Sequence, residues 1–208
     1  RISGLTVAFL GGTYNAAVYH GEALGTGPAA QFSQYYSQRD VVRLKEALAS
    51  LEGEVDLLLT CEWPKGVAGG VPATPALDPE VVAGSQQGSA IATELAQLAR
   101  PRYHVACGPD SYYARLPYIN RDLGAGPRAT RFIGLAALGS PGGAKAVHAL
   151  ALAPAADMTP DALSALPEGA TPSPFDVPHT GTKRMAENAL PEGQDWRWNM
   201  AAGRGRGR

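Results

Sequence analysis

The chain has 208 residues, enough for one full domain with a tail, and 45% of them are hydrophobic, so it can bury a core. Its net charge of −1 is unevenly spread: six basic and three acidic residues from Lys183 onward give +3, which leaves −4 on residues 1–182. This distribution argues against a body that binds polyanions in general, and no apolar run approaches the roughly 20 residues of a membrane span.

The first 107 residues predict strands that alternate with helices, the pattern of a parallel or mixed sheet covered by helices. The helices are indicated by an apolar face with a helical period and the strands by short apolar runs bounded by Gly or Pro. In chain order we expect a strand at 5–10, a loop at 13–32, a helix at 38–51, a strand at 55–60, a loop at 68–84, a helix at 89–100 and a strand at 102–107.

The second half of the chain changes character. Three further strands, at 111–115, 130–138 and 144–152, are joined by turns and predict an antiparallel addition to the sheet. From residue 154 the chain is rich in Pro and Ala and loses its periodicity, so residues 154–208 are expected to be an extended or disordered tail.

The two cysteines and the amino terminus give two further expectations. Cys61 and Cys107 are too few for a disulfide framework, which indicates a reducing compartment. Residues 1–4 are not a signal peptide, and they lead at once into a strand without an initiating Met. We therefore expect that the chain begins within a longer protein.

Residues 55–67 are the most informative stretch for function. An apolar run from Val55 to Leu59 ends abruptly in a polar loop that contains Pro64 and Gly66. Loops at the carboxyl ends of strands in α/β proteins are the usual places for ligands and metals, so this loop is a candidate site.

Four phrases, present together and in order, resemble the CwfJ family, the CWF-nineteen-like splicing factors. Leu-Leu-Thr-Cys-Glu-Trp-Pro-Lys-Gly at 58–66 resembles the family's LLT/S-x-x-WPK/R strand-loop. Arg-Pro-Arg-Tyr-His at 100–104, followed by residues 112–118, is similar to KPRYHF…YYERLPYRN. Residues 129–136 are similar to ATRFIALA, and residues 171–175 to the closing T-x-x-P-Y/F. The resemblance covers residues 5–175.

The same region is similar to the lariat debranching enzyme, a metallophosphoesterase. Its strand-loop LSHDWPRG is close to residues 59–66, its LSGIYN corresponds to residues 10–15, and its KP-x-YWFSAHLH to residues 100–110. Both resemblances imply a calcineurin-like metallophosphoesterase sandwich. Residues 1–153 would be the carboxyl-terminal part of that domain, without its first βαβ part, followed by the tail at 154–208.

The matching positions do not supply the ligands of a two-metal phosphoesterase, which needs several Asp, His and Asn side chains at strand ends. Where the debranching enzyme has the His of its strand-loop, this chain has Cys61, and where it has two further His, this chain has Gly108 and Asp110. Glycine has no side chain that can bind a metal. We therefore expect no metal cofactor and no catalysis, unless residues outside this chain supply nearly every ligand.

Several residues have both a binding and a structural interpretation. Cys61 and Cys107 each end a predicted strand, so they could form a metal or redox pair, or act as small buried apolar groups. Trp63, followed by Pro64 and Lys65, could form a partner-binding knob or cap the core. An aromatic and basic cluster could bind RNA by stacking and phosphate contacts, or form a half-buried strand. This cluster comprises Tyr112, Tyr113, Arg115 and Tyr118.

The carboxyl terminus is an RG repeat that contains Arg204, Arg206 and Arg208. Glycine keeps the backbone free and Arg supplies phosphate contacts and stacking, so the repeat predicts RNA binding with little sequence selectivity. A short solvated linker is the alternative interpretation.

The CwfJ resemblance implies a non-catalytic docking domain of a nuclear pre-mRNA splicing factor. Such a factor would associate with late spliceosomes and intron-lariat complexes and take part in lariat turnover. Its expected partners are spliceosomal proteins, the lariat debranching enzyme, and RNA (intron lariat or snRNA) bound through the tail, with no membrane partner. Two alternatives stay open: an active, divergent metal-dependent RNA phosphodiesterase, and an RNA-binding module that acts through the RG tail.

Overall fold

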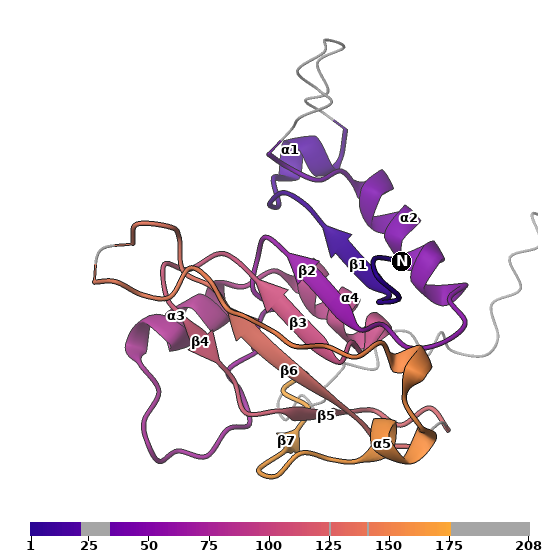
Figure 1. Ribbon diagram of the computed structural model, residues 1–208. Helices are drawn as coiled ribbons and strands as arrows, with labels where there is room; N and C mark the ends of the chain where they lie inside the picture. Colours follow the sequence, from indigo (N-terminus) through magenta and orange to yellow (C-terminus); the bar gives the residue numbers. More distant parts are fainter. Residues whose placement is uncertain (22–33, 125, 141, 176–208) are drawn as a thin grey trace, which may run out of the picture. The chain divides into compact units, whose positions relative to one another are not determined.

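The computed structural model describes residues 1–21, 34–124, 126–140 and 142–175, which belong to one compact unit (Figure 1). They form an α/β fold around a mixed sheet of seven strands in the order β1-β2-β3-β6-β5-β7, with β4 paired to β6 off this path. The predicted α/β class is confirmed. Arg204, Arg206 and Arg208 of the RG repeat lie outside the described residues.

Four strands of the sheet run parallel: β1 (Val7–Leu10), β2 (Leu57–Thr60), β3 (Tyr103–Ala106) and β6 (Arg128–Gly134). Their register pairs Leu10 with Thr60, Thr60 with Ala106, and Ala106 with Gly134. The four carboxyl ends therefore meet at one edge of the sheet, and the four amino ends at the opposite edge.

The other three strands are short and surround β6. β4 (Tyr113–Ala114) and β5 (Tyr118–Asn120) pair antiparallel with β6, and β7 (Thr171–Pro172) pairs parallel with β5. The expected antiparallel pairing is confirmed for β4 with β6, but β6 also pairs parallel with β3, and the strand predicted at 144–152 is wrong. That segment is rich in Ala, which buries little area on a pleated surface, and its Val147 is 77% exposed.

Five α-helices accompany the sheet in the described residues: α1 (Ala16–Tyr19), α2 (Gln38–Ala49), α3 (Pro79–Gln87), α4 (Ala90–Ala99) and α5 (Pro160–Ser164). α3 begins within the predicted loop at 68–84 and continues beyond it, so that prediction is wrong from Pro79 onward. Pro79 occupies the first turn, where no backbone N–H is needed, and Asp78 caps the helix by accepting from the Glu80 amide.

In the part of the chain that is described, no helix has both the length and the apolar character needed to cross a bilayer.

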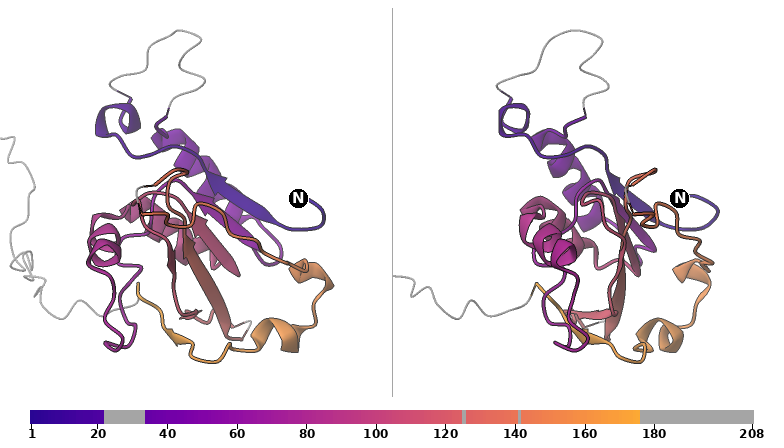
Figure 2. Two further views of the ribbon diagram at one scale, coloured as in Figure 1. Left: turned by 60° about the vertical axis from the view of Figure 1, so that its left-hand side comes forward. Right: turned by 90° about the vertical axis from the view of Figure 1, so that its left-hand side faces the viewer.

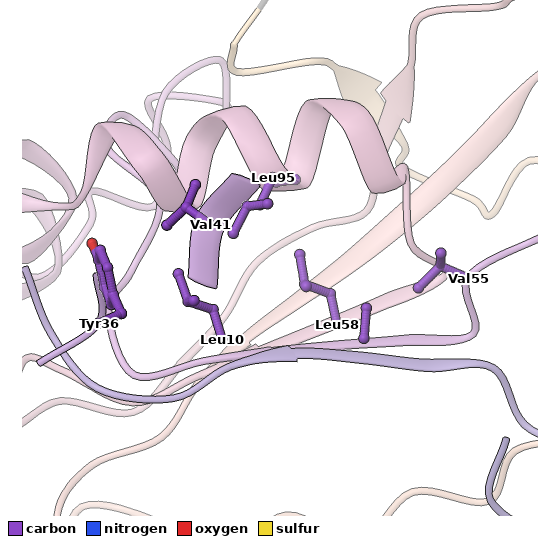
Figure 3. Packing of buried hydrophobic residues seen from close by; sticks show 8 residues of the cluster. Leu10, Tyr36, Val41, Val55, Leu58 and Leu95 are labelled. Atoms are coloured by element: carbon purple, nitrogen blue, oxygen red, sulfur yellow. The ribbon is translucent and has the colours of Figure 1, made fainter. Parts of the chain in front are cut away.

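The core has two parts. α2 and α4 pack on β1 and β2, where a first cluster includes Leu10, Val41, Leu58 and Leu95 (Figure 3). A second cluster around Trp63 and Phe132 fills the space between α3 and the β3–β6 region. Seen from the side, the helices α2 to α4 lie on one side of the sheet and the segment that carries α5 lies on the other (Figure 2).

Residues 155–175 differ from the expected extended tail. They contain a 3-10 helix (Ala155–Asp157), α5 and β7. The Ala155 amide donates to the buried Asp56 carboxylate (2.8 Å), and the Thr171 amide donates to the Pro117 carbonyl (2.8 Å). These long-range contacts hold a segment whose own sequence lacks periodicity.

Candidate functional site

A cavity of about 670 Å³ opens at the edge where β1, β2 and β3 end, the usual position of ligands in α/β proteins. Residues 61–63 after β2 and residues 108–111 after β3 form two of its walls. α3 and the start of α4 form the others, through residues that include Glu80, Ala83 and Ser89. The structure therefore places the predicted loop of residues 55–67 at a pocket.

Glu62 lies in this pocket and is held by its own chain. Its Oε2 accepts hydrogen bonds from the Tyr36 hydroxyl (2.7 Å) and from the Tyr14 amide (3.2 Å). Burial raises the pKa of Tyr36, so its phenol stays protonated and acts as the donor. Tyr36 also lies 3.2 Å from the Ser89 hydroxyl, which links Glu62 to the start of α4.

The two other carboxylates of the pocket are likewise engaged. Glu80 Oε2 accepts from the Ser111 hydroxyl (3.1 Å), and Asp110 Oδ1 accepts from the Ala137 amide (3.1 Å). Asp110 was predicted as a degenerate metal position. Glu62 and Glu80 were not predicted, although Glu62 adjoins Trp63 in the predicted loop; Glu80 was missed because α3 was predicted as a loop.

Cys61 and Cys107 are neighbours at the ends of paired strands. The Cys107 amide donates to the Thr60 carbonyl (3.1 Å), and Cys61 Sγ accepts from the Gly12 amide (3.4 Å). Partial burial, followed by the nearby Cys61, raises the pKa of the Cys107 thiol. Both thiols are free, and Cys107 is exposed, so the interpretation as buried apolar groups is wrong for Cys107.

Gly108 follows these cysteines with a backbone φ of +143°. Residues with a side chain rarely adopt this conformation, so a His introduced at this position would have a strained backbone. Position 108 is therefore unsuited to a metal-binding His for two reasons: its glycine has no side chain, and its backbone conformation disfavours one.

The donor set of the pocket does not fit a dinuclear phosphoesterase centre. Such a centre needs several His, Asp or Asn ligands directed at two ions. The pocket instead offers one thiol, that of Cys61, and three carboxylates that accept hydrogen bonds. Within the described ranges, no group of three His, Cys, Asp or Glu is placed to hold a metal ion.

Trp63 belongs to the core and not to the surface. It is 1% exposed, and its ring lies 5.8 Å from that of Tyr113 and 5.5 Å from that of Phe132. A Cβ on Gly134 would lie 2.2 Å from Trp63 Cζ2, so only glycine leaves room for the indole. Of the two interpretations of Trp63, the core cap is confirmed and the partner-binding knob is wrong.

Arg115 is also buried, at 4% exposure, and it joins three segments of chain. Its guanidinium donates to the carbonyls of Val67 (2.7 Å) and Gly69 (2.7 Å) and to the Thr171 hydroxyl (2.9 Å). It also lies 5.1 Å from the centre of the Tyr118 ring. These contacts are structural.

The predicted aromatic and basic cluster is therefore mostly interior. Tyr118 is fully buried and Tyr113 is 9% exposed, so neither can stack on a base. Tyr112 is half-buried and stacks on His148 at 6.0 Å. Of the predicted binding residues that the structure describes, Lys65 is the one whose side chain is exposed.

Comparison with known proteins gives relatives over most of this chain. Zinc finger CCCH domain-containing protein 64 of Arabidopsis thaliana is 34% identical over 201 residues, which are 96% of this chain and 30% of that protein. Zinc finger CCCH domain-containing protein 59 of Oryza sativa subsp. japonica is 40% identical over 171 residues, 79% of this chain and 27% of that protein.

CWF19-like protein 1 of Mus musculus is 35% identical over 178 residues, 83% of this chain and 30% of that protein. The chain thus spans less than a third of the length of each of these three relatives. No family model matches the chain.

Proposed function

Because the chain belongs to the CWF19-like (CwfJ) family, we propose that it is part of a splicing-related factor whose α/β body docks partners without catalysis. The body would be a degenerate calcineurin-like metallophosphoesterase domain. It would retain the ligand position of that fold and have lost the ability to bind two metal ions.

One observation carries this proposal: the carboxylates of the pocket are used by the chain itself. Glu62, Glu80 and Asp110 accept hydrogen bonds from a phenol, a hydroxyl and a backbone amide respectively. These donors orient the three carboxylates within the chain, and among the described residues they do not converge with further His, Cys, Asp or Glu side chains as a group of three. A pair of metal ions needs several such ligands directed at it.

The partners of this docking domain would be nuclear. We propose that they are spliceosomal proteins and the lariat debranching enzyme, in complexes that contain intron-lariat or snRNA. The 670 Å³ cavity is large enough for side chains of a partner protein, and it has no lysine or arginine in its lining. Its three carboxylates favour a partner segment that presents a basic side chain.

The direct test of docking places an arginine at the pocket mouth. Ala83 is exposed on α3 and lines the cavity, so Ala83→Arg fills the mouth and adds a positive charge without entering the core. Gln86→Arg is the matched control, because Gln86 is exposed on the same helix and does not line the cavity. We expect Ala83→Arg to abolish ribonuclease-resistant co-purification with spliceosomal proteins and the debranching enzyme, and Gln86→Arg to preserve it. Equal behaviour of the two variants would contradict the proposal.

Catalysis is tested separately on 2′,5′-branched RNA with added Mn²⁺, Fe²⁺ or Zn²⁺. We expect no cleavage and no bound metal after purification of the chain. Two metal equivalents together with cleavage would favour the alternative of an active, divergent phosphodiesterase.

A further inference from the structure

A second, smaller cavity of about 180 Å³ lies at the opposite edge of the sheet, where β3 and β6 begin. Its lining contains four arginines, Arg100, Arg102, Arg128 and Arg131, together with Tyr103 and apolar residues of α5. Sites for whole small molecules measure roughly 300–1,000 Å³, so this arginine cavity suits a single small group.

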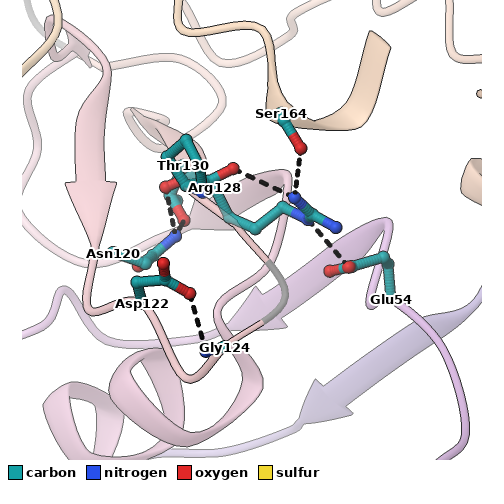
Figure 4. A network of polar contacts seen from close by, with 8 residues as sticks. Glu54, Asn120, Asp122, Gly124, Arg128, Thr130 and Ser164 are labelled. Carbon is teal, nitrogen blue, oxygen red and sulfur yellow. Dashed lines mark hydrogen bonds and ion pairs between the residues drawn. The ribbon is translucent and has the colours of Figure 1, made fainter. Parts of the chain in front are cut away.

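Two of the four guanidiniums are neutralised. Arg102 Nη1 lies 2.6 Å from Asp56 Oδ1, and Arg128 Nε lies 2.8 Å from Glu54 Oε1. Figure 4 shows Arg128 held between Glu54 and Ser164, so it has no freedom to follow a ligand. Both pairs are mainly shielded from solvent and act as the fixed wall of the cavity.

The other two guanidiniums have no acidic partner. Neither Arg100 nor Arg131 forms an ion pair with a carboxylate of the described residues. Arg131 lies over the Tyr103 ring at 5.4 Å, and Arg100 Nε is buried with no hydrogen-bond partner. The Arg100 guanidinium therefore has an unsatisfied donor and no carboxylate of the described residues to offset its charge, which is unfavourable unless an anion lies nearby.

The backbone conformation of Arg100 is a second unusual feature of this residue. Arg100 follows α4 with φ 43° and ψ 51°, the left-handed conformation. Glycine is the usual residue at this place after a helix, because a side chain is disfavoured there. Such a strained residue supports a functional role for its side chain.

We propose that the arginine cavity binds a phosphate of single-stranded RNA, with Arg100 and Arg131 as the groups that bind the anion. Guanidinium donors match the paired oxygens of a phosphate, and the half-buried Tyr103 ring, over which Arg131 lies, forms the wall beside them. The choice of RNA over a phosphorylated protein rests on the proposed splicing function. The site itself lies at the other end of the strands from the docking pocket.

The decisive variant is Arg100→Gly, which removes the guanidinium and supplies the residue that the left-handed backbone favours. A structural role for Arg100 predicts lower stability, whereas our proposal predicts unchanged or higher thermal stability together with weaker RNA binding. Arg39→Gln is the matched control, because it removes one positive charge from an exposed position on α2. Arg131→Gln tests the second group. All variants keep the full chain, including its RG repeat.

Binding of a fluorescein-labelled single-stranded RNA is measured by anisotropy over a range of salt concentrations. We expect Arg100→Gly to weaken binding about tenfold, and the slope of log K against log salt to become shallower by about 0.7, the value for one lost phosphate contact. Arg39→Gln should stay within about twofold of the unchanged chain.

Two outcomes would overturn the proposal. One is equal RNA affinity of Arg100→Gly and Arg39→Gln. The other is tighter binding of a phosphoserine peptide than of the RNA, with the peptide affinity lost in Arg100→Gly, which would identify a phosphoprotein site instead. Because Ala83→Arg tests docking at the other edge, failure here leaves the docking proposal intact, and the reverse also holds.

Discussion

His104 is fully buried beside Phe132 of the second core cluster, and its protonation state follows from its neighbours. Thr60 Oγ1 donates its single hydrogen to the Glu62 carbonyl (2.7 Å), so it accepts from His104 Nε2 at 2.9 Å. This assigns the Nε2–H tautomer and leaves Nδ1 as a buried acceptor without a partner. Burial accordingly lowers the pKa of His104 to about 3.

The depressed pKa makes His104 a source of acid sensitivity. In the unfolded chain the imidazole binds a proton near pH 6.5, whereas in the folded chain it does so near pH 3. Between these values the unfolded state binds more protons than the folded state. The contribution of neutral His104 to the free energy of unfolding is therefore complete above pH 6.5 and is lost as the pH falls toward 3. The free energy of unfolding should therefore fall by about 2 kcal/mol less between pH 7 and pH 5 in His104→Phe than in the unchanged chain. Urea unfolding at both pH values measures this, and an unchanged slope would contradict it.

Gly134 shows how closely the core is packed around Trp63. A Cβ at this position would meet the indole at 2.2 Å, and the indole is confined by Tyr113 and Phe132. We expect Gly134→Ala to lower the free energy of unfolding by about 3 kcal/mol, the upper part of the range for overpacked cores.

Gly11→Ala is the control for Gly134→Ala, because no atom lies within 4 Å of an added Cβ at Gly11. This control should change the free energy of unfolding by less than about 0.5 kcal/mol. Equal losses in the two variants, measured by denaturant titration, would show that the indole is free to shift.

At the scale of elements, the sequence predicted the helices and strands that have a periodic apolar pattern within their own residues. The strands and helices up to residue 107 that have a periodic apolar pattern lie within two residues of their predicted ends, as the observed bounds of α2 and α4 illustrate. β5 and β7 are three and two residues long, too short to carry a periodic pattern. They form because Arg115 and Tyr118 join them to distant segments, which a local pattern does not contain.

Arg115 offers a test of that explanation. Lysine has a single ammonium group in place of the three nitrogens of the planar guanidinium. Arg115→Lys therefore cannot donate to the Val67 carbonyl, the Gly69 carbonyl and the Thr171 hydroxyl together. We expect a loss of about 3 kcal/mol and faster hydrogen exchange at the Thr171 amide, whose bond to Pro117 holds β7. Arg39→Lys, at an exposed position, serves as the control. Unchanged exchange at Thr171 in Arg115→Lys would mean that β7 is held by other contacts.

At the scale of the molecule, the motifs that resemble the CwfJ family meet in the interior. Trp63 of the first packs on Tyr113 of the second and Phe132 of the third, and Arg115 binds Thr171 of the fourth. The family could therefore be recognised from the sequence, because its motifs encode the core. Four of the candidate binding residues drawn from the same motifs are buried for the same reason. The surface groups that replace them, Glu80 and Arg100 among them, are brought together by the fold and not by adjacency in sequence.

The two ends of the parallel sheet have opposite character. Among the described residues, the docking pocket at the carboxyl ends is lined by carboxylates and by no basic side chain, and the arginine cavity at the amino ends has two guanidiniums without an acidic partner. Arg102 and Cys107, which flank β3, are five positions apart, which corresponds to about 16 Å of strand. This separation would let one chain hold a basic protein segment at one end and an RNA phosphate at the other.

Separation on this scale predicts that the two activities are independent. Effects of changes more than about 7–10 Å apart without shared contacts usually add within roughly 0.5 kcal/mol. We expect Ala83→Arg to abolish partner co-purification and leave RNA affinity unchanged, and Arg100→Gly to do the reverse. The double variant should then show both losses, with an RNA affinity within about twofold of that of Arg100→Gly alone. A larger deviation, measured by anisotropy with the same RNA, would mean that the strands couple the two ends, and that docking at the pocket controls how the chain holds RNA.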